Sequence, residues 1–328
     1  MSIFAQMDAA SPRVAPRSPV FAYRMRWKRR RLLLRAWRFR HQLQRLRVDS
    51  ARIEAAPILA FSTLRNERAR LPHFLDHNRA LGVGHFLIVD NDSDDGTQEF
   101  LRGQADVSFW RAGGSYKQAR FGVDWLTCLQ FRFGHGKWCL TLDADELLVL
   151  PGGARPAAAY RPPRCHGTPG LRRADAGSVS QGPRDRGNLR ARGRPARPSA
   201  LVRPAGLPRA TARGLRQPLD PGGPRDRVFF TDQPDRAPTL SKTPLIKWRR
   251  SFAYVTSTHQ ALPMHLNRVF APSRPTGVLL HSKFLPDIAA KSAEELHRRQ
   301  HFENADFYTA YHESLIAGVD LWHPDAAR

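Results

Sequence analysis

The fold is decided by the stretch ILAFSTLRNERARLPHFLDHNRALGVGHFLIVD, residues 58–90. It opens with the apolar run 58–61 and a polar loop, and apolar side chains then recur at helical spacing across 71–81 until Gly82. A second apolar run, 85–89, follows. This pattern predicts a strand, a helix and a second strand.

The same alternation continues along the chain. Residues 107–110 predict a third strand, the apolar stripe across 115–133 predicts a helix, and 138–142 predict a fourth strand. Alternating strands and helices with short connections indicate an α/β fold with a doubly wound, mostly parallel sheet. Ligands bind such sheets at the carboxyl ends of the strands. Polar clusters follow the first, second and fourth strands, so we expect the site there.

Asp143 and Asp145 follow the fourth strand, two residues apart. Two carboxylates in this position cannot both be core side chains, and they need a cation. We expect them to project on the same side and to hold one Mg²⁺ or Mn²⁺, with positions left open for a diphosphate. A D-x-D pair alone is also typical of a polar corner between a strand and a helix.

The acidic run Asp90–Thr97 superficially resembles the calcium loop of an EF-hand, but its spacing fails. With Gly96 at the sixth position, Arg102 falls where the loop needs a bidentate glutamate, and a strand precedes the loop. We interpret Asp90 as a strand-end carboxylate able to accept a hydrogen bond from a base or ribose. Residues 94–96 are expected to form a turn and to cap a helix.

Three motifs in this order resemble glycosyltransferase family 2 and its relatives with a GT-A fold: STLRNE (62–67), IVDNDSDDGT (88–97) and LTLDADELLVLP (140–151). The resemblance covers residues 55–151 well, and 224–323 more loosely through KTPLIKW, YVTSTH and GVLLHSKFL. It implies a GT-A-like fold and transfer of a sugar from a nucleoside-diphosphate sugar to a glycan, lipid or protein acceptor. Mn²⁺ or Mg²⁺ would neutralise the leaving diphosphate. The family resemblance favours an inverting, hexosyltransferase-type reaction.

The resemblance also implies roles for individual residues. Asp90 would contact the nucleobase, Asp143 the ribose or the metal side, and Asp145 the metal itself. The nucleotide pocket would be lined by Arg65, Asn66 and Glu67.

Further candidates lie near the end of the chain. Many such folds add a C-terminal histidine to the metal site, and His281 is our candidate, with His259 as the rival. For either histidine a hydrogen-bonded structural role is the alternative. Lys247, Arg249 and Arg250 either grip the diphosphate or belong to a solvated strand edge.

The net charge of +24 is unevenly distributed along the chain. A basic N-terminal arm, residues 1–50, carries 13 basic and 2 acidic residues, and 151–227 carry 17 and 4. The expected nucleotide-sugar-binding half, 51–150, carries 11 basic and 13 acidic residues. The half that would complete the acceptor and metal side, 228–328, carries 12 basic and 10 acidic residues. The excess charge therefore lies outside the parts with a folding pattern.

Residues 151–227 contain 17 Arg, 13 Pro, 12 Gly and 12 Ala, without Lys, Glu, Ile, Phe, Met or Trp. We expect this segment to be disordered, since it has too few large apolar residues for a core and its proline density prevents helix and sheet. It is either an arginine-rich arm that binds nucleic acid or the out-of-frame translation of a GC-rich gene. In the family the general base comes from this region, so we assign no catalytic base and expect impaired catalysis.

The segment Arg24–Arg47 places aromatic and leucine side chains among many arginines, which predicts a basic amphipathic helix. Such a helix suits an anionic membrane surface, and a solvated arm is the equal alternative. We find no run long enough for a membrane helix, no secretory signal, and three cysteines without CxxC or disulfide spacing. We therefore expect a cytoplasmic protein, which the membrane interpretation of this helix would place at the inner face of the membrane.

Two alternatives to the transferase remain. A basic nucleic-acid-binding protein would use 24–47 and the arginine-rich segment, and its binding would weaken steeply with salt. We do not expect nucleic acid as a partner, because no RNP, zinc-finger or helix-turn-helix pattern is visible. A non-catalytic sugar-nucleotide binder would bind the donor without transferring or hydrolysing it.

Overall fold

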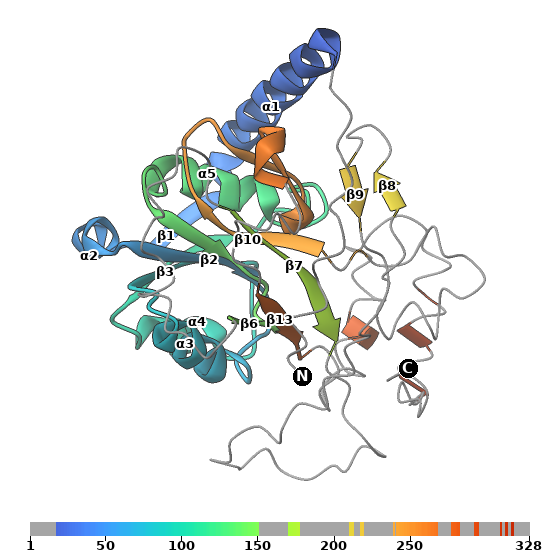
Figure 1. The fold of residues 1–328 in the computed structure, drawn as a ribbon. Coiled ribbons are helices and arrows are strands. Elements are labelled where there is room, and N and C mark those ends of the chain that lie inside the picture. The colour runs from blue at the N-terminus through green and yellow to red at the C-terminus, as the bar shows by residue number, and fades with distance from the viewer. Residues whose placement is uncertain are drawn as a thin grey trace. The chain divides into compact units, whose positions relative to one another are not determined.

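A computed structural model describes most of the N-terminal half of the chain and separate pieces of the rest (Figure 1). The described residues are 18–150, 170–177, 210–212, 217–219, 239, 241–267, 277–282, 292–294, 309, 312–313 and 316–317. They divide into two compact units, of which the larger comprises Met1–Arg173 with Lys242–Val278 and the smaller Ala174–Ser241 with Leu279–Arg328. Each unit is described by itself below.

The larger unit is built on six neighbouring strands in the order β1-β4-β3-β2-β5-β10. The strands are β1 (Leu43–Arg47), β2 (Ile58–Leu64), β3 (His85–Asp90), β4 (Val107–Ala112), β5 (Trp138–Thr141) and β10 (Ser241–Lys247). The four central strands are parallel, whereas β1 pairs antiparallel with β4 and β10 pairs antiparallel with β5. The α/β class and the mostly parallel sheet expected from the sequence are confirmed.

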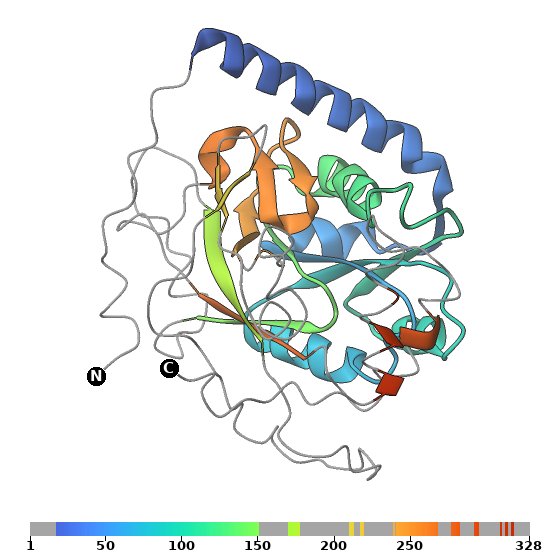
Figure 2. The same ribbon diagram turned by 90° about the vertical axis from the view of Figure 1, so that its right-hand side faces the viewer.

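Helices cover both faces of this sheet, as Figure 2 shows. They are α1 (Pro19–Phe39), α2 (Ser50–Ala55), α3 (Leu71–Ala80), α4 (Thr97–Arg102) and α5 (Val123–Phe133). Successive side chains of a strand point to opposite faces of the sheet, so each face has its own core contacts. Phe61 packs in one cluster with Trp125 of α5. Phe86 lies with its ring centroid 6.3 Å from that of Phe74 of α3. Among the described helices, none has both the length and the apolar character needed to cross a bilayer.

The strand β2 runs further than its sequence suggests. Residues 62–64 were expected to open a polar loop, yet they continue the strand and are buried. The reason is backbone pairing, because Leu64 lies in register with Asp90 of β3 and the two strands therefore end together. The polar loop begins at Arg65.

The basic segment is helical only in part. The helix α1 ends at Phe39, a short 3₁₀ turn (Arg40–Gln42) follows, and β1 then pairs with β4. The expectation of a helix through Arg47 is therefore wrong for its last residues. Without β1 the strand β4 would be a bare sheet edge, and pairing of its backbone groups overrides the helical pattern.

Several short elements follow the fourth parallel strand. The strand β6 (Glu146–Val149) is tied to α3 by a 2.7 Å hydrogen bond between His77 Nε2 and the Leu148 carbonyl. A hairpin of β11 (Ala253–Thr256) and β12 (Gln260–Leu262) is joined through a 3₁₀ turn, Ser257–His259, and a second turn, Met264–Asn267, follows it. The ring of Tyr254 on β11 packs on Trp248, with centroids 5.3 Å apart.

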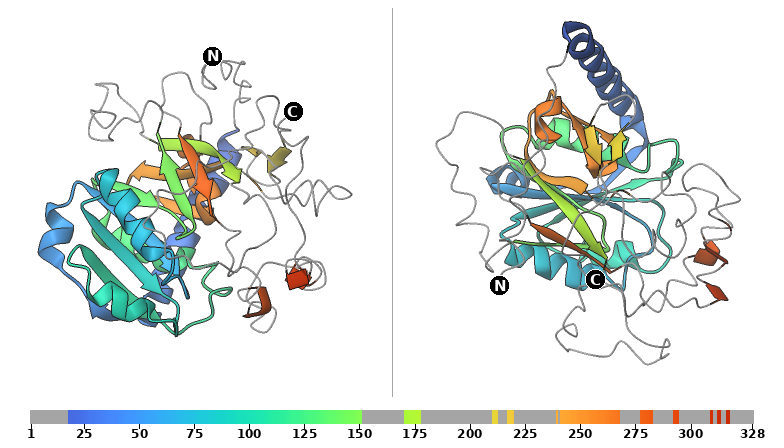
Figure 3. Two further views of the ribbon diagram at one scale, coloured as in Figure 1. Left: turned by 90° about the horizontal axis from the view of Figure 1, so that it is seen from below. Right: turned by 45° about the vertical axis from the view of Figure 1, so that its right-hand side comes forward.

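The arginine-rich segment contributes three strands, which its composition did not predict. They are β7 (Gly170–Gly177), β8 (Ala210–Ala212) and β9 (Gln217–Leu219), and the last two pair antiparallel, as seen in Figure 3. Strands form here because β7 and β8 contain no proline, while Pro218 sits in a two-stranded ribbon, where both strands are edges. The strand β13 (Val278–His281) pairs parallel with β7, with Leu279 opposite Asp175. The rest of 151–227 lies outside the described residues.

Candidate functional site

Three polar loops meet at the carboxyl edge of the parallel sheet. The strands β3, β2 and β5 are direct neighbours and run in the same direction. Leu64 lies opposite Asp90, so β2 and β3 end together, whereas β5 ends at Thr141, opposite Phe61 and three residues short of the end of β2. This brings together the predicted site loops 65–67, 90–97 and 143–146, at the position where α/β sheets bind ligands.

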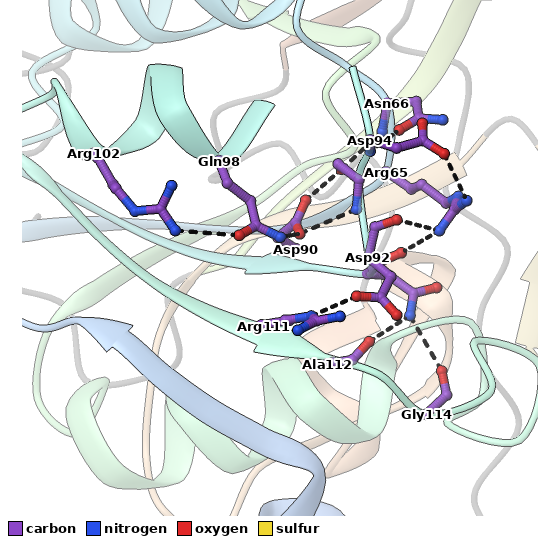
Figure 4. A network of polar contacts seen from close by, with 12 residues as sticks. Arg65, Asn66, Asp90, Asp92, Asp94, Gln98, Arg102, Arg111, Ala112 and Gly114 are labelled. Atoms are coloured by element: carbon purple, nitrogen blue, oxygen red, sulfur yellow. Dashed lines mark hydrogen bonds and ion pairs between the residues drawn. The ribbon is translucent and has the colours of Figure 1, made fainter. Parts of the chain in front are cut away.

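The loops after β2 and β3 are joined by hydrogen bonds, shown in Figure 4. The Asn66 backbone N–H donates to Ser93 Oγ at 3.0 Å, and the Asn66 side-chain oxygen accepts from the Asp94 N–H at 3.0 Å. The Arg68 N–H donates to the Asp95 carboxylate at 2.9 Å. Asn66 itself has a left-handed φ of 51°, a conformation that asparagine tolerates. These bonds fix the two loops against each other.

Arg65 lies across the same pair of loops (Figure 4). Its guanidinium donates to the carbonyl oxygens of Asn91, at 3.0 Å, and of Asp92, and it lies 3.8 Å from the carboxylate of Asp94. The side chain is 22% exposed, so part of it faces solvent. Arg65 therefore organises the acidic loop, and its predicted role in lining a nucleotide pocket stays a prediction.

Glu67 forms a capping contact at the start of α3. Its carboxylate accepts from Arg70 Nη1 at 2.8 Å, and both side chains are largely buried. Its carbonyl oxygen accepts from the N–H groups of Arg70 and Leu71. The resemblance implies that Glu67 lines the nucleotide pocket, which stays a prediction, and its described contacts are those of a helix start.

Asp90 is completely buried at the end of β3. Its carboxylate accepts from Gln98 Nε2 at 2.7 Å, from the Ser93 N–H at 3.2 Å and from the Ser93 hydroxyl. The carboxylate predicted to meet a nucleobase thus holds its own turn and the first part of α4. Its contact with a base stays a prediction.

The loop after β5 contains an ion pair that the sequence analysis missed. The buried carboxylate of Glu146 contacts Lys242 Nζ, which also lies 3.2 Å from Asp143 Oδ2. Glu146 is fully buried and Lys242 is 6% exposed, whereas Asp143 is about half exposed. The Glu146 carboxylate also accepts from the Asp143 N–H at 3.3 Å. Lys242 reaches this loop because β10 pairs antiparallel with β5, which brings the first residues of β10 to the end of β5.

Carboxylate oxygens of Asp145 and Glu146 lie within 4.8 Å of each other. Two such oxygens match the ligand preference of Mg²⁺ or Mn²⁺, so the donor set fits a hard cation. The structure therefore brings Glu146 to Asp145, while it directs Asp143 to Lys242. His281 is the last residue of β13 in the smaller unit, and the rival His259 ends a 3₁₀ turn in the larger one.

The cations Lys247, Arg249 and Arg250 lie at the opposite end of the strands from the acidic loop. Because β10 is antiparallel to β5, Lys247 pairs with Trp138, at the start of the strand that ends near the acidic loop. All three side chains are exposed. Their exposure supports the solvated-edge interpretation, and a grip on a diphosphate at the acidic loop would need them at the opposite end of the strands.

A fourth loop, between β4 and α5, also reaches the end of β2. Arg120, Phe121 and Gly122 have left-handed φ values of 51°, 57° and 77°. A Cβ at Gly122 would lie 2.7 Å from Thr63 Oγ1, so only glycine fits this close approach. The apolar stripe predicts a helix across the whole of 115–133, which is wrong for its first residues because α5 begins at Val123.

No protein-family model matches the chain, and no curated protein matches it either. Among solved structures it is similar to the mannosyltransferase PcManGT from Pyrobaculum calidifontis, determined in complex with GDP-Man and Mn²⁺. The two are 17% identical, with a TM-score of 0.25 and 47% of this chain covered. The match spans 46% of that structure, which is less than half of its length. A likeness of this extent carries no conclusion about function.

Proposed function

We propose that this chain binds a nucleoside-diphosphate sugar together with a divalent cation and is built as a glycosyltransferase. One observation carries the proposal: the three motifs that resemble family 2 follow adjacent parallel strands and meet at one edge of the sheet. Ligand sites of α/β sheets lie at this edge. The order of the motifs along the chain is the order that the resemblance requires.

The nucleoside end of the donor is assigned to the paired loops after β2 and β3. Arg65, Asn66, Glu67 and Asp90 all lie in these loops, which are held together by hydrogen bonds. A pocket wall fixed in this way reduces the entropy lost when a ligand binds. This assignment is supported by the place of these residues at the ligand-binding edge of the sheet. Their described contacts are with the two loops themselves.

The diphosphate end is assigned to the acidic loop after β5. We assign Asp145 as the central metal ligand, with Asp143 and His281 as the ligands inferred from the resemblance and Glu146 as a carboxylate that the structure adds. A bound Mn²⁺ or Mg²⁺ would neutralise charge on the leaving diphosphate. Lys242 already balances Asp143 and Glu146, so it lowers the negative charge that the loop presents.

The test is calorimetric binding of GDP and UDP to the full chain, with and without Mn²⁺. We expect Mn²⁺-dependent binding that Asp145→Asn weakens by at least about tenfold. The matched control is Asp76→Asn, which removes an exposed carboxylate on α3. Equal nucleotide binding by the two variants would remove the site assignment. Binding without transfer from any tested sugar nucleotide would leave a sugar-nucleotide binder in place of an enzyme.

A further inference from the structure

The helix α1 exposes an apolar stripe to solvent. The structure describes eight exposed large apolar side chains, and five of them lie on this helix. They are Val20 (68% exposed), Tyr23 (59%), Trp27 (48%), Leu34 (48%) and Trp37 (55%). With about 100° of rotation per residue, the five fall within about 100° of the helix circumference. They therefore lie on one face of the helix, which we call the aromatic stripe.

The opposite face of α1 is docked on the protein. Ala36, about 180° around the helix from Trp27, is buried, and Phe39 packs against the core. Arg35 Nε donates to the fully buried carboxylate of Asp124 on α5 at 2.7 Å. Figure 2 shows α1 as the outermost element on the side of the sheet that carries α5. The aromatic stripe is therefore held facing outward.

Positive charge surrounds the stripe. The helix contains eight basic residues and no acidic one. Arg24, Arg31 and Arg38 are exposed and lie within about 60° of Trp27 around the helix. Arg30 lies over the Trp27 ring at 5.5 Å and Arg40 over the Trp37 ring at 3.7 Å. A partner of this face must accept apolar side chains and carry negative charge.

We propose that the aromatic stripe docks the protein on the surface of a membrane that contains anionic lipids, with α1 lying in the plane of the interface. Tryptophan and tyrosine favour the headgroup level, where the ring is in an apolar medium and its N–H or O–H meets water. Arginines next to them reach lipid phosphates. This inference is independent of the proposed transferase activity.

The aliphatic members of the stripe favour a membrane over a nucleic acid. Val20 and Leu34 gain free energy only by leaving water for an apolar medium. Binding to a phosphate backbone relies on charged and polar donors, and it would not use these two side chains. A membrane interface uses both the arginines and the aliphatic groups.

The test is co-sedimentation of the full chain with vesicles of pure phosphatidylcholine, and with vesicles containing about one third phosphatidylglycerol. We expect binding to the mixed vesicles only. The variant Trp27→Ser/Trp37→Ser should bind at least about tenfold more weakly. Arg24→Gln/Arg31→Gln/Arg38→Gln should also lose at least about tenfold, and added salt should weaken the wild-type protein.

The matched controls lie off the stripe. Phe131→Ser removes an exposed aromatic ring of α5, and Arg45→Gln/Arg132→Gln/Arg250→Gln removes three exposed positive charges outside α1. Both should bind the mixed vesicles like the wild-type protein, and circular dichroism checks that each variant is folded. The proposal fails if the tryptophan variant binds vesicles as the wild-type protein does, or if the wild-type protein binds only a DNA oligonucleotide. It also fails if the stripe instead holds two copies together, seen as a dimer that the tryptophan variant dissociates.

Discussion

Lys242 and Glu146 form a buried ion pair where β10 runs beside the end of β5, although 96 positions separate them in the sequence. A buried charge is stable only with its partner, because the desolvation cost of each group is offset by the other. The pair therefore joins β10, from the C-terminal part of the chain, to the acidic loop after β5.

Removing one partner of this pair should destabilise the fold. We expect Lys242→Met to lower the free energy of unfolding by about 3–5 kcal/mol, because it leaves the Glu146 carboxylate buried without its cation. The double variant Lys242→Met/Glu146→Leu should regain most of that loss. Urea denaturation without added divalent cations measures both variants. If the double variant were as unstable as the single one, the unpaired charge would not be the cause.

The close approach of Gly122 to Thr63 gives a second prediction. Gly122→Ala places a methyl group 2.7–2.8 Å from Thr63 side-chain atoms at a φ of +77°. The matched control is Gly136→Ala, which has a φ of +80° and no atom within 4 Å of the added Cβ. The control should cost about 1–2 kcal/mol of unfolding free energy, from the left-handed backbone alone. Gly122→Ala should cost at least about 1 kcal/mol more, from overpacking. Equal losses in thermal denaturation would show that the contact with Thr63 relaxes freely.

The pH dependence of stability gives a third prediction. Burial lowers the pKa of His85 below its usual value, and its Nε2 lies 2.8 Å from Ser108 Oγ. The folded state therefore binds a proton less readily than the unfolded chain. A buried neutral His85 therefore stabilises the folded protein fully when the pH is above the pKa of histidine in the unfolded chain, about 6.5. This stabilisation is lost as the pH falls below that value.

We expect the free energy of unfolding of the wild-type protein to fall as the pH drops below about 6.5. His85→Asn should flatten this dependence, whereas His135→Asn, at an exposed position, should leave it unchanged. His77 has a pKa lowered chiefly by burial, so some dependence of the same sign should remain in His85→Asn. The measurement is urea unfolding at a series of pH values. A wild-type curve that is flat across this range would contradict the assignment.

The central sheet could be predicted from the sequence because its signals are local. The apolar runs at 58–61 and 85–89, with the helical spacing between them, require only neighbouring residues, and they correctly gave parallel strands with polar loops at one edge. The strand β1 could not be predicted, since its residues carry a helical pattern and its conformation is set by pairing with β4.

The sequence predicted where the candidate site lies in the sheet, but it did not predict which side chains contact one another there. Asp90 was expected at the end of a strand and lies there, but its binding of Gln98 and Ser93 depends on how the turn folds. No residue near Lys242 in the sequence indicates that it contacts the acidic loop. Only the pairing of β10 with β5 brings it to Asp143. Contacts between distant segments decide such details, and periodicity does not encode them.

The pairing of β5 with β10 also bears on how the chain tolerates insertion. Asp143 and Lys242 lie 99 positions apart in sequence and 3.2 Å apart in space, so the two ends of the intervening segment start from adjacent strands. The entropy of closing such a loop grows only with the logarithm of its length, and doubling the loop adds only about 0.6 kcal/mol. An insertion placed in this segment beyond β6 therefore adds little to the free energy of closing it, and it leaves the pairing of β5 with β10 unchanged.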